Sequence, residues 1–166
     1  MGYQLIETIE VGVGGAASIE FTGIPQDGVD LVILASAGVG TGGPIQMRLN
    51  GDSGSNYNYK NLRGNGGIAS STGTSQTEME IGLGESSDAN TVGSYSVYIS
   101  NYTSSIAKSV SCDAVGEGNV ASAYKVITAG NYTGTSPVTS ALLKSWNVGY
   151  PFEEYSTFSL YKITAD

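Results

Sequence analysis

The chain has 166 residues, of which 13% are charged, and its 15 acidic and 7 basic residues give a formal net charge of -8. The basic residues are scattered along the sequence, which argues against direct nucleic-acid binding because neutralising phosphates requires a concentrated basic face. The absence of histidine excludes Ser-His-Asp and Cys-His catalysis. A chain of this length fits one domain, residues 1–166, with a core that needs neither disulfides nor metals.

Short segments of alternating apolar and polar residues recur about every 10 to 14 residues, and each is bounded by Gly, Pro, Asn or Ser. This spacing is typical of an all-β sandwich or barrel. Val29–Ala37 is apolar enough to form a central core strand. In the first part of the chain the predicted strands are Gln4–Val11, Ala17–Thr22, Val29–Ala37, Ile45–Asn50 and Tyr57–Leu62.

The segment Ile45–Gly67 carries the clearest pattern, a strand, a turn and a second strand. Asn50 and Gly51 end the first strand, and these residue types suit a backbone with positive φ. The segment therefore predicts an antiparallel hairpin. The oxygen-rich run Asn50–Asn56 could hold calcium, but it lacks the DxDxDG order and the closing Glu of a calcium loop. A polar turn is the favoured interpretation, and no metal site is predicted.

The segment Gly64–Ser75 is rich in Gly, Ser and Thr and is predicted to be a loop that is either mobile or ordered by a partner. Loops at the ends of a sandwich are free to carry contacts. The candidate contact residues are Gly64, Asn65, Gly66, Gly67, Ser70, Ser71 and Thr72.

The second half of the chain continues the same β pattern. Glu78 and Glu80 oppose the apolar face of their strand, where solvated carboxylates are expected. Ser140–Lys144 could form a helical turn, but the alternation around it favours an extended strand. The predicted strands are Glu78–Leu83, Val92–Asn101, Ile106–Val115, Tyr124–Ala129, Val138–Trp146 and Tyr155–Ile163. The whole chain is predicted to be an antiparallel β-sandwich of about 8–10 strands.

Aromatic residues supply a second candidate contact site. Trp146, Tyr150 and Phe152 surround Pro151 and could form a recognition surface or a plug that closes the core. Several tyrosines fall at expected strand edges or turns, where the ring can pack while the hydroxyl stays in water. They are Tyr57, Tyr59, Tyr98, Tyr102, Tyr124, Tyr132 and Tyr150. The single cysteine, Cys112, is predicted to be a small buried hydrophobic residue.

Other site chemistry is weakly supported. The pairs Glu78/Glu80 and Glu153/Glu154 could in principle serve a glycosidase, which needs only two carboxylates. The Gly-rich runs at 12–15 and 38–43 are not followed by the Lys-Ser or Lys-Thr pair that ends a phosphate-binding loop. The chain is therefore predicted to be no enzyme and to bind no cofactor. The N-terminus lacks a basic region followed by an apolar run, so synthesis in a cytoplasm is expected, and no segment is apolar and long enough to span a membrane.

Several short motifs spread over nearly the whole length resemble a family of small structural proteins of tailed-bacteriophage virions. They are Leu5-Ile6-Glu7-Thr8, Gly14-Gly15-Ala16-Ala17-Ser18-Ile19-Glu20-Phe21, Ile24-Pro25-Gln26, Arg48-Leu49-Asn50-Gly51-Asp52 with Asn56-Tyr57, Tyr98-Ile99-Ser100-Asn101-Tyr102, Tyr155-Ser156-Thr157 and Leu160-Tyr161.

The resemblance implies a jelly-roll-like sandwich that is made in the host bacterial cytoplasm and assembled into the virion. Its expected partners are the major capsid protein, other virion proteins and further copies of itself, often as a trimer. The favoured function is that of a capsid decoration (cement) protein that binds and stabilises the outer shell. The alternative is a tail fibre or tail accessory protein, or an adhesin that binds host-surface glycans.

Overall fold

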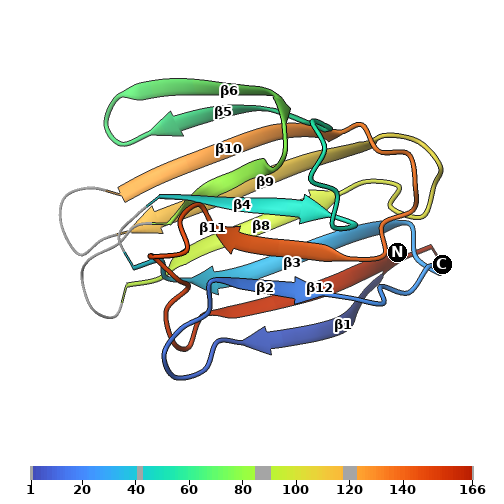
Figure 1. Cartoon of the computed structure of the whole chain (residues 1–166), viewed down its shortest axis with the longest axis horizontal. Coiled ribbons are helices and arrows are strands. Elements are labelled where there is room, and N and C mark those ends of the chain that lie inside the picture. Colours follow the sequence, from blue (N-terminus) through green and yellow to red (C-terminus); the bar gives the residue numbers. More distant parts are fainter. Residues whose placement is uncertain (1, 41–42, 85–90, 118–122, 166) are drawn as a thin grey trace.

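The computed structural model describes residues 2–40, 43–84, 91–117 and 123–165, and their regular secondary structure consists of β-strands (Figure 1). The alternating sequence pattern explains this, because a period of two presents one apolar face to a core. The strands are β1 (Gly2–Glu10), β2 (Ser18–Phe21), β3 (Asp30–Ala37), β4 (Gly43–Leu49), β5 (Tyr57–Gly64), β6 (Ile68–Gln76), β7 (Met79–Gly84), β8 (Gly93–Ile99), β9 (Lys108–Glu117), β10 (Ala123–Tyr132), β11 (Ala141–Ser145) and β12 (Thr157–Thr164).

Two antiparallel sheets of unequal width form the sandwich. The larger has eight strands in the order β1-β12-β3-β8-β9-β10-β5-β6, and the smaller has four in the order β2-β11-β4-β7. The small sheet covers one face of the large sheet, with β7 lying over β9 and β10 (Figure 1). The predicted all-β antiparallel sandwich is therefore confirmed.

The core lies between the sheets and is built by strict alternation. In β8, Tyr95, Val97 and Ile99 are buried, whereas Ser94 and Ser96 are exposed. The buried thiol of Cys112 confirms its prediction as a core residue, and burial raises its pKa to about 12. The opposite face of the large sheet is covered by no other described strand.

The structure corrects the strand count and one segment. The described residues form twelve strands rather than 8–10, and the predicted loop Gly64–Ser75 is mostly the strand β6. The segment is rich in Ser and Thr and lacks the alternation of apolar and polar residues that predicted the other strands. Its backbone nevertheless pairs with β5 from Gly64↔Ile68 to Tyr59↔Gly73. Only the turn Asn65–Gly67 remains a loop, and it makes β5 and β6 the real hairpin of this region.

The predicted hairpin within Ile45–Gly67 is wrong. β4 pairs with β7 and β11 in the small sheet, whereas β5 pairs with β10 and β6 in the large one. The turn after β4 thus passes from one sheet to the other. Its conformation was predicted correctly, because Asn50 and Gly51 have φ values of 54° and 63°.

The remaining local predictions concern helices. Ala141–Ser145 is the strand β11, which confirms the extended interpretation over the helical turn. Within the described residues, no helix has the length and hydrophobicity to cross a bilayer.

Candidate binding surface

The predicted contact segment lies at one edge of the large sheet. Gly64 ends β5, Asn65, Gly66 and Gly67 form the turn, and Ser70, Ser71 and Thr72 lie on the edge strand β6. Gly66 has a φ of 99°, a conformation that favours glycine. The structure thus brings all seven residues together, on a hairpin rather than in a loose loop.

The predicted aromatic cluster is divided between the surface and the core. The rings of Trp146 and Tyr150 lie 6.2 Å apart, and Trp146 is 48% exposed. The Trp146 indole lies on the backbone of Gly43, where a Cβ would come within 1.9 Å of its Nε1. Phe152 is fully buried against Phe158, with ring centroids 4.8 Å apart. The plug interpretation therefore applies to Phe152, which presents nothing to a partner.

The outer face of the large sheet, meaning the face turned away from the small sheet, is covered by no other described strand. Two neighbouring rows of cross-strand partners cross all eight strands on it, and only Asp113 and Lys60 in them are charged. Aliphatic and aromatic side chains alternate there with Ser, Thr and Ala. The first row is Ser70, Leu62, Ile127, Asp113, Ser96, Leu34, Ser159 and Thr8, and the second is Thr72, Lys60, Ala129, Ser111, Tyr98, Val32, Tyr161 and Leu5.

A depression of about 450 Å³ with mostly polar side chains at its rim, the polar depression, lies at the β6 end of this face. It is open to solvent, and the backbones of β9, β10, β5 and β6 form its floor. The side chains at its rim supply amide, hydroxyl and ammonium groups. They are Asn58, Lys60, Thr72, Thr74, Ser109 and Asn131.

An apolar pit of about 160 Å³ lies next to the β5–β6 turn. Leu62, Ile127 and Ile68 line it, and each is at least half exposed. Lys125, at its rim, forms an ion pair with Asp113 on the same face. Exposed apolar side chains gathered beside a depression mark a surface suited to binding a partner.

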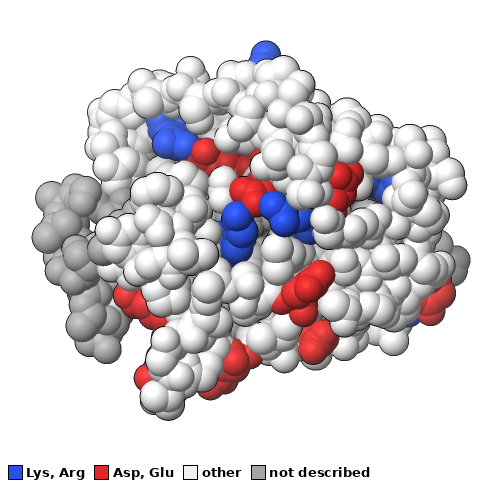
Figure 2. Space-filling model, in the orientation of Figure 1, with Lys and Arg blue, Asp and Glu red and all other residues white. Residues whose placement is uncertain are grey.

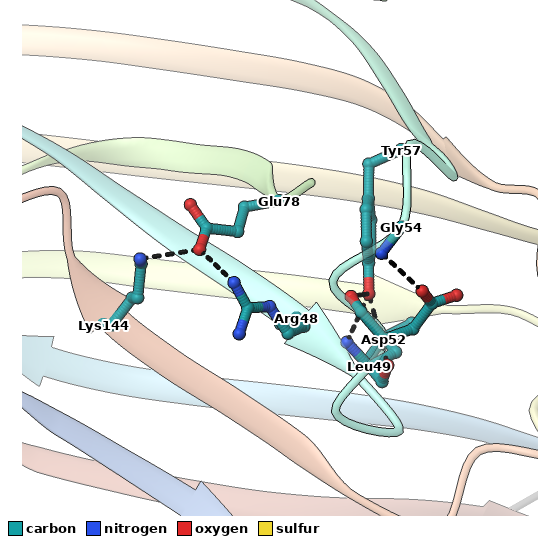
Figure 3. A network of polar contacts seen from close by, with 7 residues as sticks. All are labelled: Arg48, Leu49, Asp52, Gly54, Tyr57, Glu78 and Lys144. Carbon is teal, nitrogen blue, oxygen red and sulfur yellow. Dashed lines mark hydrogen bonds and ion pairs between the residues drawn. The ribbon is translucent and has the colours of Figure 1, made fainter. Parts of the chain in front are cut away.

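Charged side chains gather instead on the face of the small sheet (Figure 2). Glu78 accepts hydrogen bonds from Arg48 Nη2 at 2.5 Å and from Lys144 Nζ at 2.6 Å (Figure 3). Glu80 is buried and paired with Arg63 of β5, so this ion pair joins the two sheets. The prediction of solvated carboxylates was wrong for both residues, since each is largely covered and held by cations.

The network around Asp52 fixes the turn that passes between the sheets (Figure 3). The Asp52 carboxylate accepts hydrogen bonds from the Gly54 N–H at 2.8 Å, from Asn56 Nδ2 at 2.8 Å and from the Tyr132 hydroxyl at 2.9 Å. The Gly54 hydrogen bond, followed by that of Asn56, lowers the Asp52 pKa. Burial and the neighbouring Asp52 carboxylate raise the pKa of Tyr132 to about 12.

Tyr57 joins the same network from the core. Its hydroxyl accepts a hydrogen bond from the Leu49 N–H at 2.9 Å, and the carbonyl oxygen of Asp52 lies 3.0 Å away as an acceptor. The rings of Tyr57 and Tyr132 stack at 4.9 Å. The expectation that these tyrosines keep their hydroxyls in water was wrong for Tyr57, Tyr102 and Tyr132, which are all buried.

We expect Asp52→Asn to lower the free energy of unfolding by about 1–3 kcal/mol at pH 7, since hydrogen bonds to a charged acceptor are lost. The lowered pKa means that the carboxylate stabilises the fold fully above its unfolded pKa of about 3.9. This stabilisation is lost as the pH falls below about 4 and through the folded pKa. Urea titrations at pH 7 and pH 2.5 should therefore show a difference between variant and wild type that shrinks on acidification.

The matched control for this prediction is Asp113→Asn, because the Asp113–Lys125 pair is exposed. A surface pair of this kind contributes at most about 1 kcal/mol. An Asp52→Asn difference that stayed constant between pH 7 and pH 2.5 would contradict the assigned role.

No group of three or more Cys, Asp or Glu residues within the described ranges is placed to hold a metal ion. No family model, curated protein or solved structure matches the chain. The candidate binding surface is therefore inferred from the geometry of the fold alone. Sequence reasoning found its β5–β6 end but missed the outer face, because periodicity does not tell which face of a strand a second sheet covers.

Proposed function

We propose that this chain is a bacteriophage virion structural protein that binds the outer capsid shell as a decoration protein. One observation supports this function best, the uncovered and weakly charged outer face of the eight-stranded sheet. Eight strands spaced about 4.8 Å apart span roughly 35 Å, which is room for a typical interface of about 800 Å² per partner. The sequence resemblance to virion proteins gives the class of partner.

In this proposal the β5–β6 end of the outer face meets the capsid protein. The apolar pit of Leu62, Ile68 and Ile127 supplies the buried centre of the contact, and the polar depression beside it supplies hydrogen-bonding groups at the rim. Few charges have to be desolvated there, because Asp113 and Lys125 already neutralise one another.

Antibody labelling of intact particles, followed by cryo-EM, tests the location. Density spread over the head supports a decoration protein. Density confined to the tail would overturn the decoration function, and absence of the protein from purified particles would overturn a virion function altogether.

The contact surface is tested separately with Ile127→Thr and Leu62→Ser. We expect each change to weaken rebinding to particles that lack the protein by about tenfold or more, which corresponds to about 1.4 kcal/mol. Val13→Thr is the matched control, because Val13 is an exposed β-branched residue outside the outer face. Equal binding by all four proteins would place the contact elsewhere.

The polar depression favours one alternative, a tail accessory protein or adhesin that binds glycans. Its amide and hydroxyl groups suit the hydroxyls of a sugar, and Trp146, exposed beside the half-buried Tyr150, provides an aromatic ring nearer the small sheet. Binding on a glycan array that Asn131→Ala abolishes would support the adhesin, and no binding to any glycan would count against it.

A further inference from the structure

The strand β6 is the open edge of the large sheet. It is the last strand in the sheet order and pairs only with β5 among the described strands, at the top of Figure 1. From Ile68 to Gly73 it pairs regularly, and beyond Gly73 the register shifts and Ser75 adopts a φ of 52°. Along these six residues, every second residue thus presents its backbone N–H and C=O groups to a new strand.

Between Ile68 and Gly73, before that register shift, this edge lacks the usual protection against strand addition. Natural edge strands carry charges, prolines or bulges, or they are very short. β6 contains neither a charged residue nor a proline over its nine residues. The opposite edge, β1, has Glu7, Glu10 and a register shift after Leu5, and the small sheet ends in the four-residue strand β2 and in β7, which lies over the large sheet.

We infer that β6 pairs in an antiparallel manner with β6 of a second copy of this chain, across a two-fold axis at Ser71. Such pairing places Ala69 opposite Gly73 and Ser70 opposite Thr72, so the side chains that face one another between Ala69 and Gly73 are all small. Two copies, each with a net charge of -8, repel one another over their acidic surfaces, and an uncharged edge allows close approach. An isologous two-fold contact also closes, whereas β6 paired with β1 of the next copy would continue as a fibre.

Ser71 itself provides a second, independent observation. Its Oγ is buried and forms no hydrogen bond with the described residues, although a buried hydroxyl without a partner is costly. At the two-fold axis Ser71 faces Ser71 of the other copy, with Cβ atoms about 4.5–5.5 Å apart. Each hydroxyl then has a partner within reach.

The resulting dimer contains one continuous sheet of sixteen strands, twice the eight of one chain. The inference goes beyond the proposed function, since it concerns the purified chain alone. It also differs from the trimer that the virion resemblance implies.

The oligomeric state tests the inference directly. Light scattering and sedimentation of the purified chain at 10–100 µM are expected to give the mass of two chains, and Ser71→Asp is expected to weaken dimerisation at least tenfold by placing two carboxylates face to face. Circular dichroism and the Tm confirm that the variant is folded. A monomer or a trimer of the wild-type chain overturns the inference.

Cross-linking tests the register. Ser71→Cys, oxidised with diamide, is expected to give a disulfide-linked dimer in most chains, because two facing cysteines lie close enough to bond. Ser96→Cys is the control, since Ser96 is exposed on the central strand β8 and cannot meet its own copy at this edge. Cys112 is buried, so it adds no background. Equal cross-linking of the two variants overturns the inference, whether or not the chain is found on virions.

Discussion

Replacing Phe152 with alanine should lower the free energy of unfolding by about 3–5 kcal/mol, the usual cost of removing a buried phenylalanine. The ring is fully buried and packs edge-on against Phe158. Its backbone bridges Ala16 and Val39, so the residue joins three segments that are distant in sequence. The cavity therefore opens where several parts of the chain are held together.

Denaturant titration of Phe152→Ala beside Trp146→Ala separates a core residue from a surface one. Trp146 is about half exposed, and its removal should cost about 1 kcal/mol, typical of a partly exposed position. If the two variants lost the same free energy of unfolding, Phe152 would not close the core as described.

Gly15→Ala is expected to cost about 3 kcal/mol or more, from a strained backbone and a lost hydrogen bond. Gly15 has a φ of 77°, and an added Cβ would lie 2.6 Å from the carbonyl oxygen of Phe152. That same oxygen accepts a hydrogen bond from the Ala16 N–H at 3.0 Å. Because backbone atoms cannot move aside as a side-chain end can, the bridge between Ala16 and Phe152 should open.

Gly14→Ala is the control for this prediction. Gly14 also has a positive φ, 92°, but nothing lies within 4 Å of an added Cβ. The Gly14→Ala variant should therefore have a free energy of unfolding only about 1–2 kcal/mol below that of the wild type, the cost of a left-handed backbone for alanine. Thermal unfolding of both variants measures this difference in stability. If Gly14→Ala lowered the stability as much as Gly15→Ala, the contact with Phe152 would have no effect.

The sequence predicted most strands because alternation is a local property. β3, β8 and β12 were found by their apolar faces, and their bounds agree within a few residues. β6 was missed, since its Ser, Thr and Gly residues form a strand through backbone pairing with β5 rather than through a buried face. The sequence also did not predict which sheet each strand joins. The turn after β4 has the same residue pattern whether the chain returns to the same sheet or crosses to the other.

The candidate surface was predicted only in part, and for a related reason. The β5–β6 turn was identified by its glycines, whereas Phe152 was assigned to a contact cluster because an aromatic ring beside Pro151 can lie in a core or on a surface. Glu80 was expected in water, yet Arg63 of the facing sheet pairs with it. Such partners become visible only when the two sheets are brought together.

The place of β12 in the large sheet has a consequence for synthesis of the chain. β12 lies between β1 and β3 and pairs with both, so nothing in the large sheet joins these two strands before β12 has been translated. During elongation, β1 lacks β12, the one strand that it pairs with among the described residues, and one edge of β3 stays unpaired. Closure of the large sheet therefore follows release of β12 from the ribosome, and such long-range pairing is slow to form. Translation that stops before β12 leaves a nascent chain with the apolar edge of β3 open to aggregation.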